Sequence, residues 1–286
     1  MKFLPPLLVI FFVASSLFFH KWNGEGRAKV PSDYQRIVSM APSYSETMVA
    51  LKQSHRLVGV TTHCDLKELK EITRIGTFTN ANVEIILSLK PDLVLAVPHP
   101  LATQTLRLLE KQGIEVFAHQ PDSLNDIRFV TESLAEKLGV KYQAAELNTQ
   151  LEHALALAKK RLEDYQKPNS TILIAIAHTP LVVAGKKTFM AEIANHIGFT
   201  NLAHNTQAAW PIWPLENLIS NPPDFFVILE GVKVLGAYQR LFRTLNLHNH
   251  SSHFKLIIPK RPLFFSPSPA IIRDIEYFAE LLSTSV

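Results

Sequence analysis

The chain has 286 residues, of which 47% are hydrophobic and 9% aromatic, and its mean hydropathy is close to zero. This composition predicts folded domains with hydrophobic cores and excludes a disordered tail, a fibre and a protein with several membrane spans. The formal charge is +4, from 29 Lys and Arg against 25 Asp and Glu, without a long basic run, so no nucleic acid partner is expected. The single cysteine, Cys64, excludes an intramolecular disulfide and a cysteine-rich zinc module.

The first residues have the order of a secretory signal. Lys2 precedes an apolar stretch over residues 3–19, and the polar residues 20–27 follow it. The stretch is shorter than the ~20 residues that span a bilayer, and it contains two prolines. We therefore expect a signal over residues 1–28 that directs export, with an uncleaved N-terminal anchor as the alternative. A lipid anchor is not expected, because no cysteine follows the apolar stretch.

Beyond residue 29, short β-rich runs alternate with helical ones. In the first half, buried strands are predicted at residues 36–40, 57–60, 92–97 and 114–118. Apolar residues at helical spacing predict helices over residues 45–51, 83–89 and 101–112. This alternation is typical of a parallel sheet, and we expect an N-terminal α/β lobe over residues 29–140.

The second half repeats the alternation. Its predicted strands are residues 171–177, 225–229 and 254–258. Its predicted helices are residues 188–197, 215–219, 234–245 and 270–282. We expect a C-terminal α/β lobe over residues 168–286.

Residues 141–167, between the halves, contain neither Gly nor Pro, and their apolar residues fall on one helical face. They predict one amphipathic helix of ~40 Å, long enough to run down the side of two lobes. The alternative is an ordinary crossover helix within one continuous sheet. A rigid helical connection would limit how far the lobes can open.

Catalytic signatures are absent from the sequence. It contains no Gly-x-Ser-x-Gly, His-Glu-x-x-His or Gly-x-Gly-x-x-Gly pattern. Residues 185–188 (GKKT) look like the end of a phosphate loop, but Pro180 stands where that loop needs its first glycine. Cys64 has no positioned base beside it, so we expect it to support its loop rather than to act as a nucleophile.

Several histidines and aromatic residues follow predicted strands. In open parallel sheets ligands bind beyond the carboxyl ends of the strands. An inter-lobe cleft lined with imidazole and aromatic rings would suit a flat or metal-containing ligand, although each histidine could instead be a hydrogen-bonded loop residue. The strand-following histidines are His63, His99, His119 and His178. Loops expected at the same rim carry Phe78, Trp210, Trp213, Glu230 and Phe265.

The densest histidine cluster is His248, His250 and His253. It precedes the predicted strand at residues 254–258, which places it at the amino end of the sheet. We interpret it as a solvated loop with adventitious metal binding as the alternative.

The sequence resembles a known family in several ordered segments. These are residues 36–43 (RIVSMAPS), 58–65 (VGVTTHCD), 75–78 (IGTF) and 89–94 (LKPDLV) in the first half, and 184–186, 189–202 and 210–219 in the second. They are similar to the helical-backbone periplasmic binding proteins, the substrate-binding components of ABC importers for cobalamin, ferric siderophores and haem. The resemblance implies two Rossmann-like lobes joined by one long helix, a ligand cleft between them, a periplasmic location, a monomer and an ABC permease as partner.

Within this family the cobalamin-binding branch is the most similar, through residues 63–65 and Trp210-Pro211 ahead of Glu216. This branch has Tyr-Pro after the aspartate, where the chain has Leu66-Lys67. Aromatic cleft positions of the branch appear here as His63, Val97 and Ile176, while Phe78 and Trp210 remain aromatic.

The resemblance implies a binding protein, not an enzyme, that has no resident cofactor and takes cobalamin or a related corrinoid or metal chelate as its ligand. One alternative is haem or a ferric siderophore, with His63, His99 or His178 coordinating the iron. Another is a bare Zn or Mn ion held by histidines and Glu230. A chelatase or corrinoid-processing enzyme is the alternative from a different class.

The resemblance also implies two docking residues. In this family one glutamate on each lobe reaches an arginine on the permease, and the matching residues are Glu84 and Glu216. Each follows a turn at an expected helix start, where negative charge is stabilised, so a purely structural role is the alternative.

Overall fold

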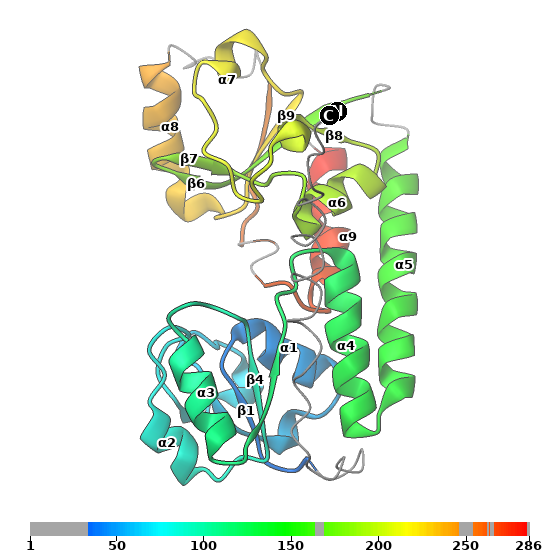
Figure 1. Cartoon of the computed structure of the whole chain (residues 1–286). Helices are drawn as coiled ribbons and strands as arrows, with labels where there is room; N and C mark the ends of the chain where they lie inside the picture. Colours follow the sequence, from blue (N-terminus) through cyan, green and yellow to red (C-terminus); the bar gives the residue numbers. More distant parts are fainter. Residues whose placement is uncertain (1–33, 164–168, 246–253, 262, 264–265, 285–286) are drawn as a thin grey trace, which may run out of the picture. The chain divides into compact units, whose positions relative to one another are not determined.

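The computed structural model describes residues 34–163, 169–245, 254–261, 263 and 266–284. Residues 31–286 form one compact unit, and the predicted signal over residues 1–28 lies outside the described residues. The unit contains two sheets, each covered by helices, in an N-terminal and a C-terminal lobe (Figure 1). The lobe boundaries at residues 140 and 168 stay a prediction.

The N-terminal sheet is fully parallel, with the strand order β3-β2-β1-β4-β5. Ile37, Leu93 and Leu95 pack on one face, while Val38 and Val94 pack on the other. Helices cover both faces, so these strands read as continuous apolar runs. The elements are β1 (Ile37–Ser39), α1 (Pro42–Ala50), β2 (Leu57–Val60), β3 (Thr73–Arg74), α2 (Val83–Ser88), β4 (Leu93–Ala96), α3 (Thr103–Lys111) and β5 (Glu115–Ala118).

The C-terminal sheet has the order β10-β9-β6-β7, with β8 paired to β6. β7 is antiparallel to β6, and the other pairs are parallel. Ile172 and Ile174 face one hydrophobic cluster, and Leu173 and Ala175 face another. The elements are β6 (Thr171–His178), β7 (Leu181–Val183), α6 (Phe189–His196), β8 (Thr200–Asn201), α7 (Asn217–Ser220), β9 (Phe225–Ile228), α8 (Leu235–Thr244), β10 (Lys255–Ile257) and α9 (Ile271–Thr284).

Short 3-10 helices complete the described elements. They are Ser54–Arg56, Lys67–Leu69, Leu202–Asn205 and Val232–Val234. In the described part of the chain, no helix has both the length and the apolar character needed to cross a membrane.

The predicted connecting helix is observed as α5 (Lys141–Glu163), and the end predicted at residue 167 lies outside the described residues. Its Ala144 belongs to a hydrophobic cluster of the N-terminal lobe, whereas Leu151, Leu155 and Leu162 belong to one of the C-terminal lobe. α5 is therefore built into both cores, as a rigid connection requires.

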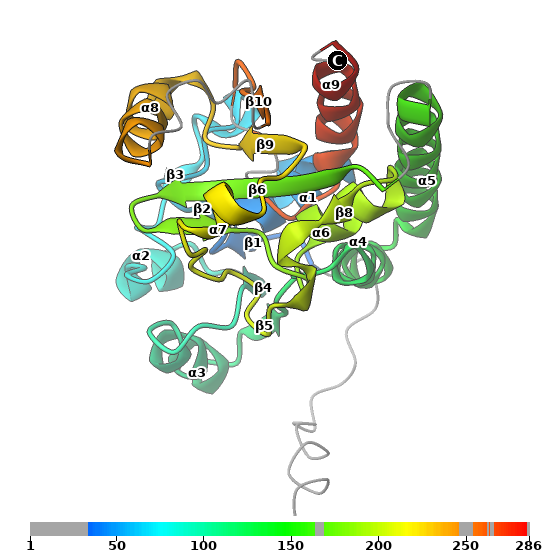
Figure 2. The ribbon, with the colours of Figure 1, turned by 90° about the horizontal axis from the view of Figure 1, so that it is seen from above.

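A second helix accompanies α5 and was not predicted. This helix, α4 (Leu124–Leu138), packs along α5 and also contacts α6 (Figures 1 and 2). Its first turns carry Leu124 and Ile127 into the core of the C-terminal lobe, and Val130 and Leu134 pack into the N-terminal lobe. The lobes are thus connected by an antiparallel pair of helices.

The start of α4 is fixed by a capping box. The Ser123 hydroxyl accepts a hydrogen bond from the Asp126 amide at 3.0 Å, and the Asp126 carboxylate accepts from the Ser123 amide at 2.9 Å. Burial alone would raise the pKa of the Asp126 carboxyl, but hydrogen bonds from Ser123 and His119 outweigh it and lower that pKa below its usual value. Gly139 ends the helix in the left-handed conformation, with φ of 71°.

Replacing the cap should destabilise the protein measurably. We expect Ser123→Ala to lower the free energy of unfolding by about 0.5–2 kcal/mol, because the Asp126 amide in the first turn of α4 loses its partner. Ser133→Ala, in the interior of the same helix, is the matched control and should change it by less than about 0.5 kcal/mol. Urea unfolding measures both.

The cost of Ser123→Ala should also depend on pH. Because the folded-state pKa of Asp126 is lowered, its ionised form stabilises the fold above the unfolded-state pKa, and this contribution is lost as the pH falls through the folded-state pKa. The difference between the variant and the parent protein should therefore shrink in acid. An equal difference at neutral and acidic pH would contradict the capping role of Asp126.

Candidate functional site

A hollow of about 350 Å³ lies at the carboxyl ends of the N-terminal strands. All five strands contribute to it through residues that follow their last positions, as the topology of a parallel sheet predicts. Two further lining residues, Ser266 and Pro267, come from the segment that precedes α9. The residues from the strand ends are Ala41, Pro42 and Ser43 after β1, His63 after β2, Phe78 after β3, Val97 after β4, and Gln120 and Pro121 after β5.

Among the described residues, the lining of the hollow is mostly apolar and includes no Lys, Arg, Asp or Glu. His63, which is exposed, is the only ionisable side chain among these lining residues. Gln120 adds an amide, although its Nε2 already donates to Asp122 at 2.9 Å. Such a surface can provide apolar area to a ring system together with a few polar contacts.

Two predicted residues meet at the edge of the hollow. The rings of Phe78 and His99 are 5.4 Å apart and nearly perpendicular. Nδ1 of His99 accepts a hydrogen bond from the Leu101 amide at 3.2 Å, so in the neutral ring the proton resides on Nε2. His99 can therefore donate a hydrogen bond to a ligand, but this tautomer offers no free lone pair to a metal.

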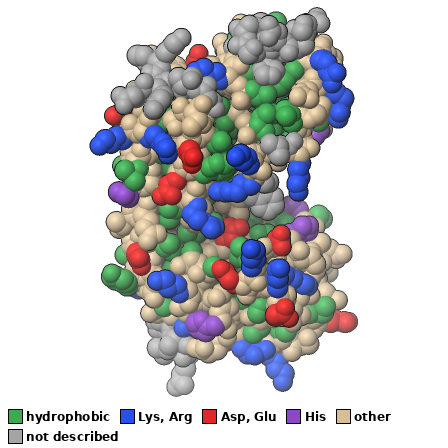
Figure 3. All heavy atoms as spheres, turned by 180° about the vertical axis from the view of Figure 1, so that it is seen from behind, with side chains coloured by type: hydrophobic (Ala, Val, Ile, Leu, Met, Phe, Trp, Pro, Cys, Tyr) green, Lys and Arg blue, Asp and Glu red, His purple; other side chains and the backbone are tan. Residues whose placement is uncertain are grey.

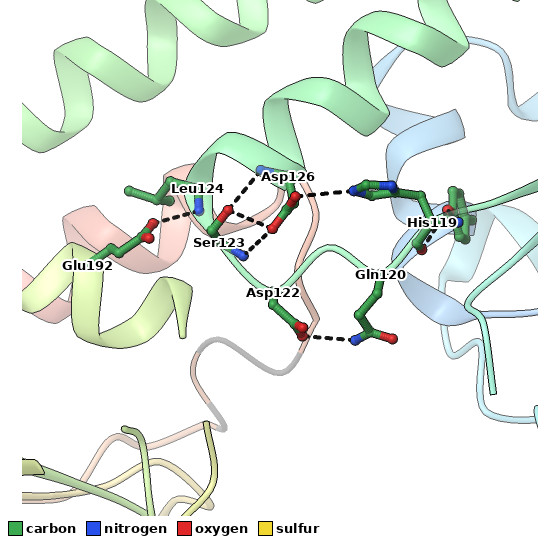
Figure 4. Close-up of polar contacts among 8 residues, drawn as sticks. His119, Gln120, Asp122, Ser123, Leu124, Asp126 and Glu192 are labelled. Atoms are coloured by element: carbon green, nitrogen blue, oxygen red, sulfur yellow. Dashed lines mark hydrogen bonds and ion pairs between the residues drawn. The ribbon is translucent and has the colours of Figure 1, made fainter. Parts of the chain in front are cut away.

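His119 serves the connection between the lobes. Its Nε2 lies 3.2 Å from Oδ1 of Asp126, at the start of α4 (Figure 4). The Tyr44 hydroxyl donates to the His119 carbonyl at 3.0 Å and accepts from the His119 amide at 3.1 Å. Burial raises the pKa of Tyr44, so its hydroxyl remains protonated for this contact. These contacts fit the alternative that His119 is a hydrogen-bonded loop residue rather than a ligand-binding one.

Residues 119–123 form a segment that crosses from the N-terminal lobe to α4, and we call it the crossover segment. Hydrogen bonds to the C-terminal lobe also hold it in place. The Phe189 amide donates to the Asp122 carbonyl at 2.7 Å. The Leu124 amide donates to the Glu192 carboxylate of α6 at 2.7 Å (Figure 4). The crossover segment is therefore tied at one end to α1 and at the other to α6.

α1 holds a second segment beside the hollow. The Ser268 hydroxyl, which is buried just before α9, donates to the Glu46 carboxylate at 2.5 Å. Ser266 and Pro267 of the hollow directly precede it. Tyr44 and Glu46 thus fix the two chain segments that border the hollow on the side of the C-terminal lobe.

His178 and Glu230 lie together in the C-terminal lobe, at the carboxyl ends of the adjacent parallel strands β6 and β9. Nδ1 of His178 is 3.7 Å from Oε2 of Glu230. The Tyr238 hydroxyl donates to the same oxygen at 3.2 Å, and its ring lies 5.5 Å from that of His178. Each of the two predicted side chains is about one-third exposed.

Trp210 and Trp213 are placed differently, although both lie in the loop formed by residues 206–213. This loop runs beside β7 through hydrogen bonds from the Val183 amide to the Pro211 carbonyl and from the Trp213 amide to the Leu181 carbonyl. Trp210 is 40% exposed, so its ring is not buried under the loop. Trp213 is only 9% exposed and packs in a hydrophobic cluster of the C-terminal lobe.

A glycine makes room for the loop formed by residues 206–213. A Cβ atom at Gly185 would lie 2.4 Å from the Ala208 carbonyl oxygen and 2.7 Å from the Thr206 hydroxyl. The Gly185 amide donates to the Ala209 carbonyl at 2.8 Å. The glycine in GKKT therefore allows a close backbone approach, consistent with rejecting the phosphate-loop interpretation.

Glu84 and Glu216 are exposed. They lie at the starts of α2 and α7, two helices that belong to different lobes (Figure 1). Glu84 lies in the first turn of α2, whose amino end is capped by Asn82, and Glu216 directly precedes α7. Among the described residues, neither carboxylate has a hydrogen-bond or ion-pair partner. Both helix starts exist, so the structural role and the docking role remain compatible.

Other predicted residues are buried or lie outside the described residues. Phe265 and the cluster of His248, His250 and His253 lie outside them. Cys64 is buried, and its carbonyl accepts a hydrogen bond from Arg74 at 3.0 Å. Within the described ranges, no three His, Cys, Asp or Glu side chains are grouped so that they could hold a metal ion.

Sequence reasoning missed several residues of the site. Gln120 and Pro121 directly follow a predicted strand, so the rule that selected the histidines could have selected them as well. Ser266 and Pro267 belong to a Pro- and Ser-rich turn ahead of a predicted helix. The contact of Tyr238 with Glu230 had no sequence signal, because it depends on how α8 packs.

The surface charges do not form a basic patch on the face seen from behind. Lys and Arg side chains alternate there with Asp and Glu (Figure 3). This mixture agrees with the expectation from the sequence that the positive charge is dispersed.

The protein belongs to the periplasmic binding protein family, whose model it matches over residues 37–236. The uncharacterized ABC transporter substrate-binding lipoprotein YvrC of Bacillus subtilis is 28% identical over 257 residues, which are 88% of this chain and 81% of that protein. A vitamin B12-binding protein of Vibrio vulnificus is 27% identical over 212 residues, 71% of this chain and 75% of that protein. A periplasmic heme-binding protein of Pseudomonas aeruginosa has the same two-lobed fold, with a TM-score of 0.69 at 24% identity over 88% of this chain and 94% of the other.

Removing the Tyr44 hydroxyl should loosen the crossover segment. In Tyr44→Phe the ring stays in the core, the His119 carbonyl loses its partner, and the His119 amide keeps only its 3.3 Å contact with the Ala96 carbonyl. We therefore expect the free energy of unfolding to fall by about 1–3 kcal/mol. Tyr142→Phe, at an 81% exposed position on α5, is the matched control.

Hydrogen exchange followed by mass spectrometry measures the local effect, which should be faster exchange over residues 119–123. Unchanged exchange in that segment would mean that Tyr44 does not hold it.

Proposed function

We propose that the protein is an exported substrate-binding protein that captures a corrinoid or another planar metal chelate between its lobes and passes it to an ABC permease. The observation that carries this proposal is the hollow, to which all five N-terminal strands contribute and whose described lining residues include no Asp, Glu, Lys or Arg. An uncharged, ring-lined surface suits a macrocycle that is largely apolar.

Cobalamin is our first choice within this ligand class. Support comes from the vitamin B12-binding relative and from the aromatic residues Phe78 and Trp210, both accessible to a ligand. A strongly anionic ferric siderophore is less favoured, because the described residues that line the hollow include no Lys or Arg to pair with it.

Haem is the second candidate, favoured by a specific observation. His178 lies beside Glu230 in an arrangement that suits metal coordination, and heme-binding proteins share the fold. Porphyrin and corrin both present a flat macrocycle with a central metal, so the hollow by itself does not separate them.

Binding and release complete the proposed cycle, without a covalent step. A corrinoid or haem incubated with the protein should be recovered chemically unchanged, and a processing enzyme would instead modify it. Because α4 and α5 are built into both cores, we expect ligand binding to change the lobe orientation only slightly. We further propose that the exported protein acts as a monomer in the periplasm.

Delivery would use the two exposed glutamates. Glu84 and Glu216 lie on different lobes, and the described residues leave their carboxylates free to meet two arginines on a two-fold permease. One acidic contact on each lobe would orient the cleft over the transport pathway.

Trp210 and Phe78 should contribute to ligand affinity. Tryptophan fluorescence titrations with cyanocobalamin, cobinamide, haemin and a ferric siderophore should show micromolar or tighter binding of a corrinoid. Trp210→Ala and Phe78→Ala should each weaken it by about tenfold or more, because an aromatic contact worth ~1.5–3 kcal/mol is lost.

Tyr142→Ala, at an exposed position on α5, is the control for removing an aromatic ring and should bind like the parent protein. If none of the four compounds binds saturably, the proposal that the protein binds a metal chelate is wrong. If haemin binds and neither corrinoid does, haem is the ligand instead of a corrinoid.

Replacing the docking glutamates should separate transport from binding. Glu84→Ala and Glu216→Ala should each retain corrinoid affinity but weaken permease association by about 30-fold or more, because an interfacial charge pair is worth ~2–5 kcal/mol. Uptake by cells and binding to the permease in nanodiscs measure this loss.

Glu146→Ala, an exposed acidic position on α5, is the control for the change in net charge. Normal uptake by both docking variants would leave helix-start stabilisation as the only role of these residues.

A further inference from the structure

The four histidines that follow strands differ in what their ring nitrogens contact. Nδ1 of His99 accepts a backbone amide hydrogen, and Nε2 of His119 contacts Asp126. His63 has no hydrogen-bond partner among the described residues that would orient its ring. Only His178, of these four, has a carboxylate facing its Nδ1 atom.

The surroundings of His178 fix its tautomer. Nδ1 is buried and has no hydrogen-bond partner in the described part of the chain, while Oε2 of Glu230 lies 3.7 Å away. No Lys or Arg in that part forms an ion pair with Glu230, so the carboxylate charge favours a proton on Nδ1. A neutral ring protonated at Nδ1 leaves the lone pair of Nε2 free, and a ring that is one-third exposed is accessible to a ligand.

Tyr238 holds the carboxylate in place. Its hydroxyl donates to Oε2 of Glu230 at 3.2 Å, and its ring is completely buried in the core below His178. Burial and, secondarily, the charge of Glu230 raise the pKa of Tyr238, so the phenol keeps the proton that it donates. The Tyr238–Glu230–His178 series therefore runs from the core to the exposed end of the sheet.

This arrangement is the one that metal-binding histidines commonly have. A histidine that coordinates a metal through one nitrogen usually donates its other N–H to a carboxylate, which orients the ring and makes the free nitrogen more basic. The gap of 3.7 Å is slightly longer than a hydrogen bond, and contacts of this kind shorten when the ligand binds.

We propose that His178 coordinates the central metal of a planar tetrapyrrole through Nε2, with Glu230 and Tyr238 as the residues that position it. This inference rests on the proposed function and adds that coordination by His178 needs an exchangeable axial position on the metal of the chelate. Diaquocobinamide and haemin have such a position, whereas cyanocobalamin, whose two axial positions are occupied, would bind without this coordination.

The test compares His178→Ala with the parent protein in titrations with haemin, diaquocobinamide and cyanocobalamin. The parent protein should shift the visible bands of haemin or of diaquocobinamide to those of an imidazole complex, and the responding compound identifies the macrocycle. His178→Ala should lose this shift and bind the same compound at least tenfold more weakly, while its cyanocobalamin affinity stays as in the parent protein. His153→Ala, at an exposed position on α5, controls for adventitious haem binding by surface histidines.

Glu230→Gln tests the positioning role. The imidazole bands should persist, because the amide oxygen still accepts from Nδ1, but affinity should fall about 10- to 100-fold. The reduction potential of bound haem should become more positive, because a neutral acceptor lets the imidazole donate less charge to the iron. A residue that is only structural would not change the potential.

Each outcome decides the inference. Binding of haemin or cobinamide without imidazole bands, or with bands that survive His178→Ala, overturns the coordination by His178 and leaves the proposed binding function standing. Failure of the parent protein to bind any of the three compounds overturns both. An unchanged potential in Glu230→Gln overturns the positioning role alone.

Discussion

The structure depends on one packing arrangement, the antiparallel pair α4 and α5, which is embedded in both hydrophobic cores. Leu124 and Ile127 of α4 enter the C-terminal core, and the later residues of the same helix enter the N-terminal core. A rotation of one lobe against the other would have to pull apolar side chains out of a core, at ~25 cal/mol for every Å² exposed. The pair of helices therefore resists a change in the orientation of one lobe against the other.

Much of the fold could be predicted from the sequence because apolar periodicity is a local signal. The seven strands expected from short apolar runs are all present, and the Gly- and Pro-free stretch after residue 140 is the long helix α5. α4 was missed although Ser123, Asp126 and Gly139 provide its start and stop signals. β7, with three residues, and β8, with two, are too short to show a period.

The candidate site was predictable only in part, because topology places residues at a rim but does not orient their side chains. The rule of strand ends selected His63, which lines the hollow, yet it treated four histidines as equivalent. Their contacts distinguish them, because His99 accepts from the Leu101 amide, His119 contacts Asp126 and His178 faces Glu230. Trp213 was expected in the same rim but is packed in a hydrophobic cluster of the C-terminal lobe.

The loop formed by residues 206–213 is attached to β7 and to Gly185 through backbone groups. No side chain of residue 210 takes part in these bonds, so the path of the loop does not depend on which amino acid stands there. Position 210 can consequently change during evolution, or in a designed library, while the scaffold stays the same. Gly185 has no such freedom, because any side chain would collide with the loop. A fixed glycine beside an exposed, replaceable aromatic residue thus gives the protein a surface position that can vary without a cost in folding.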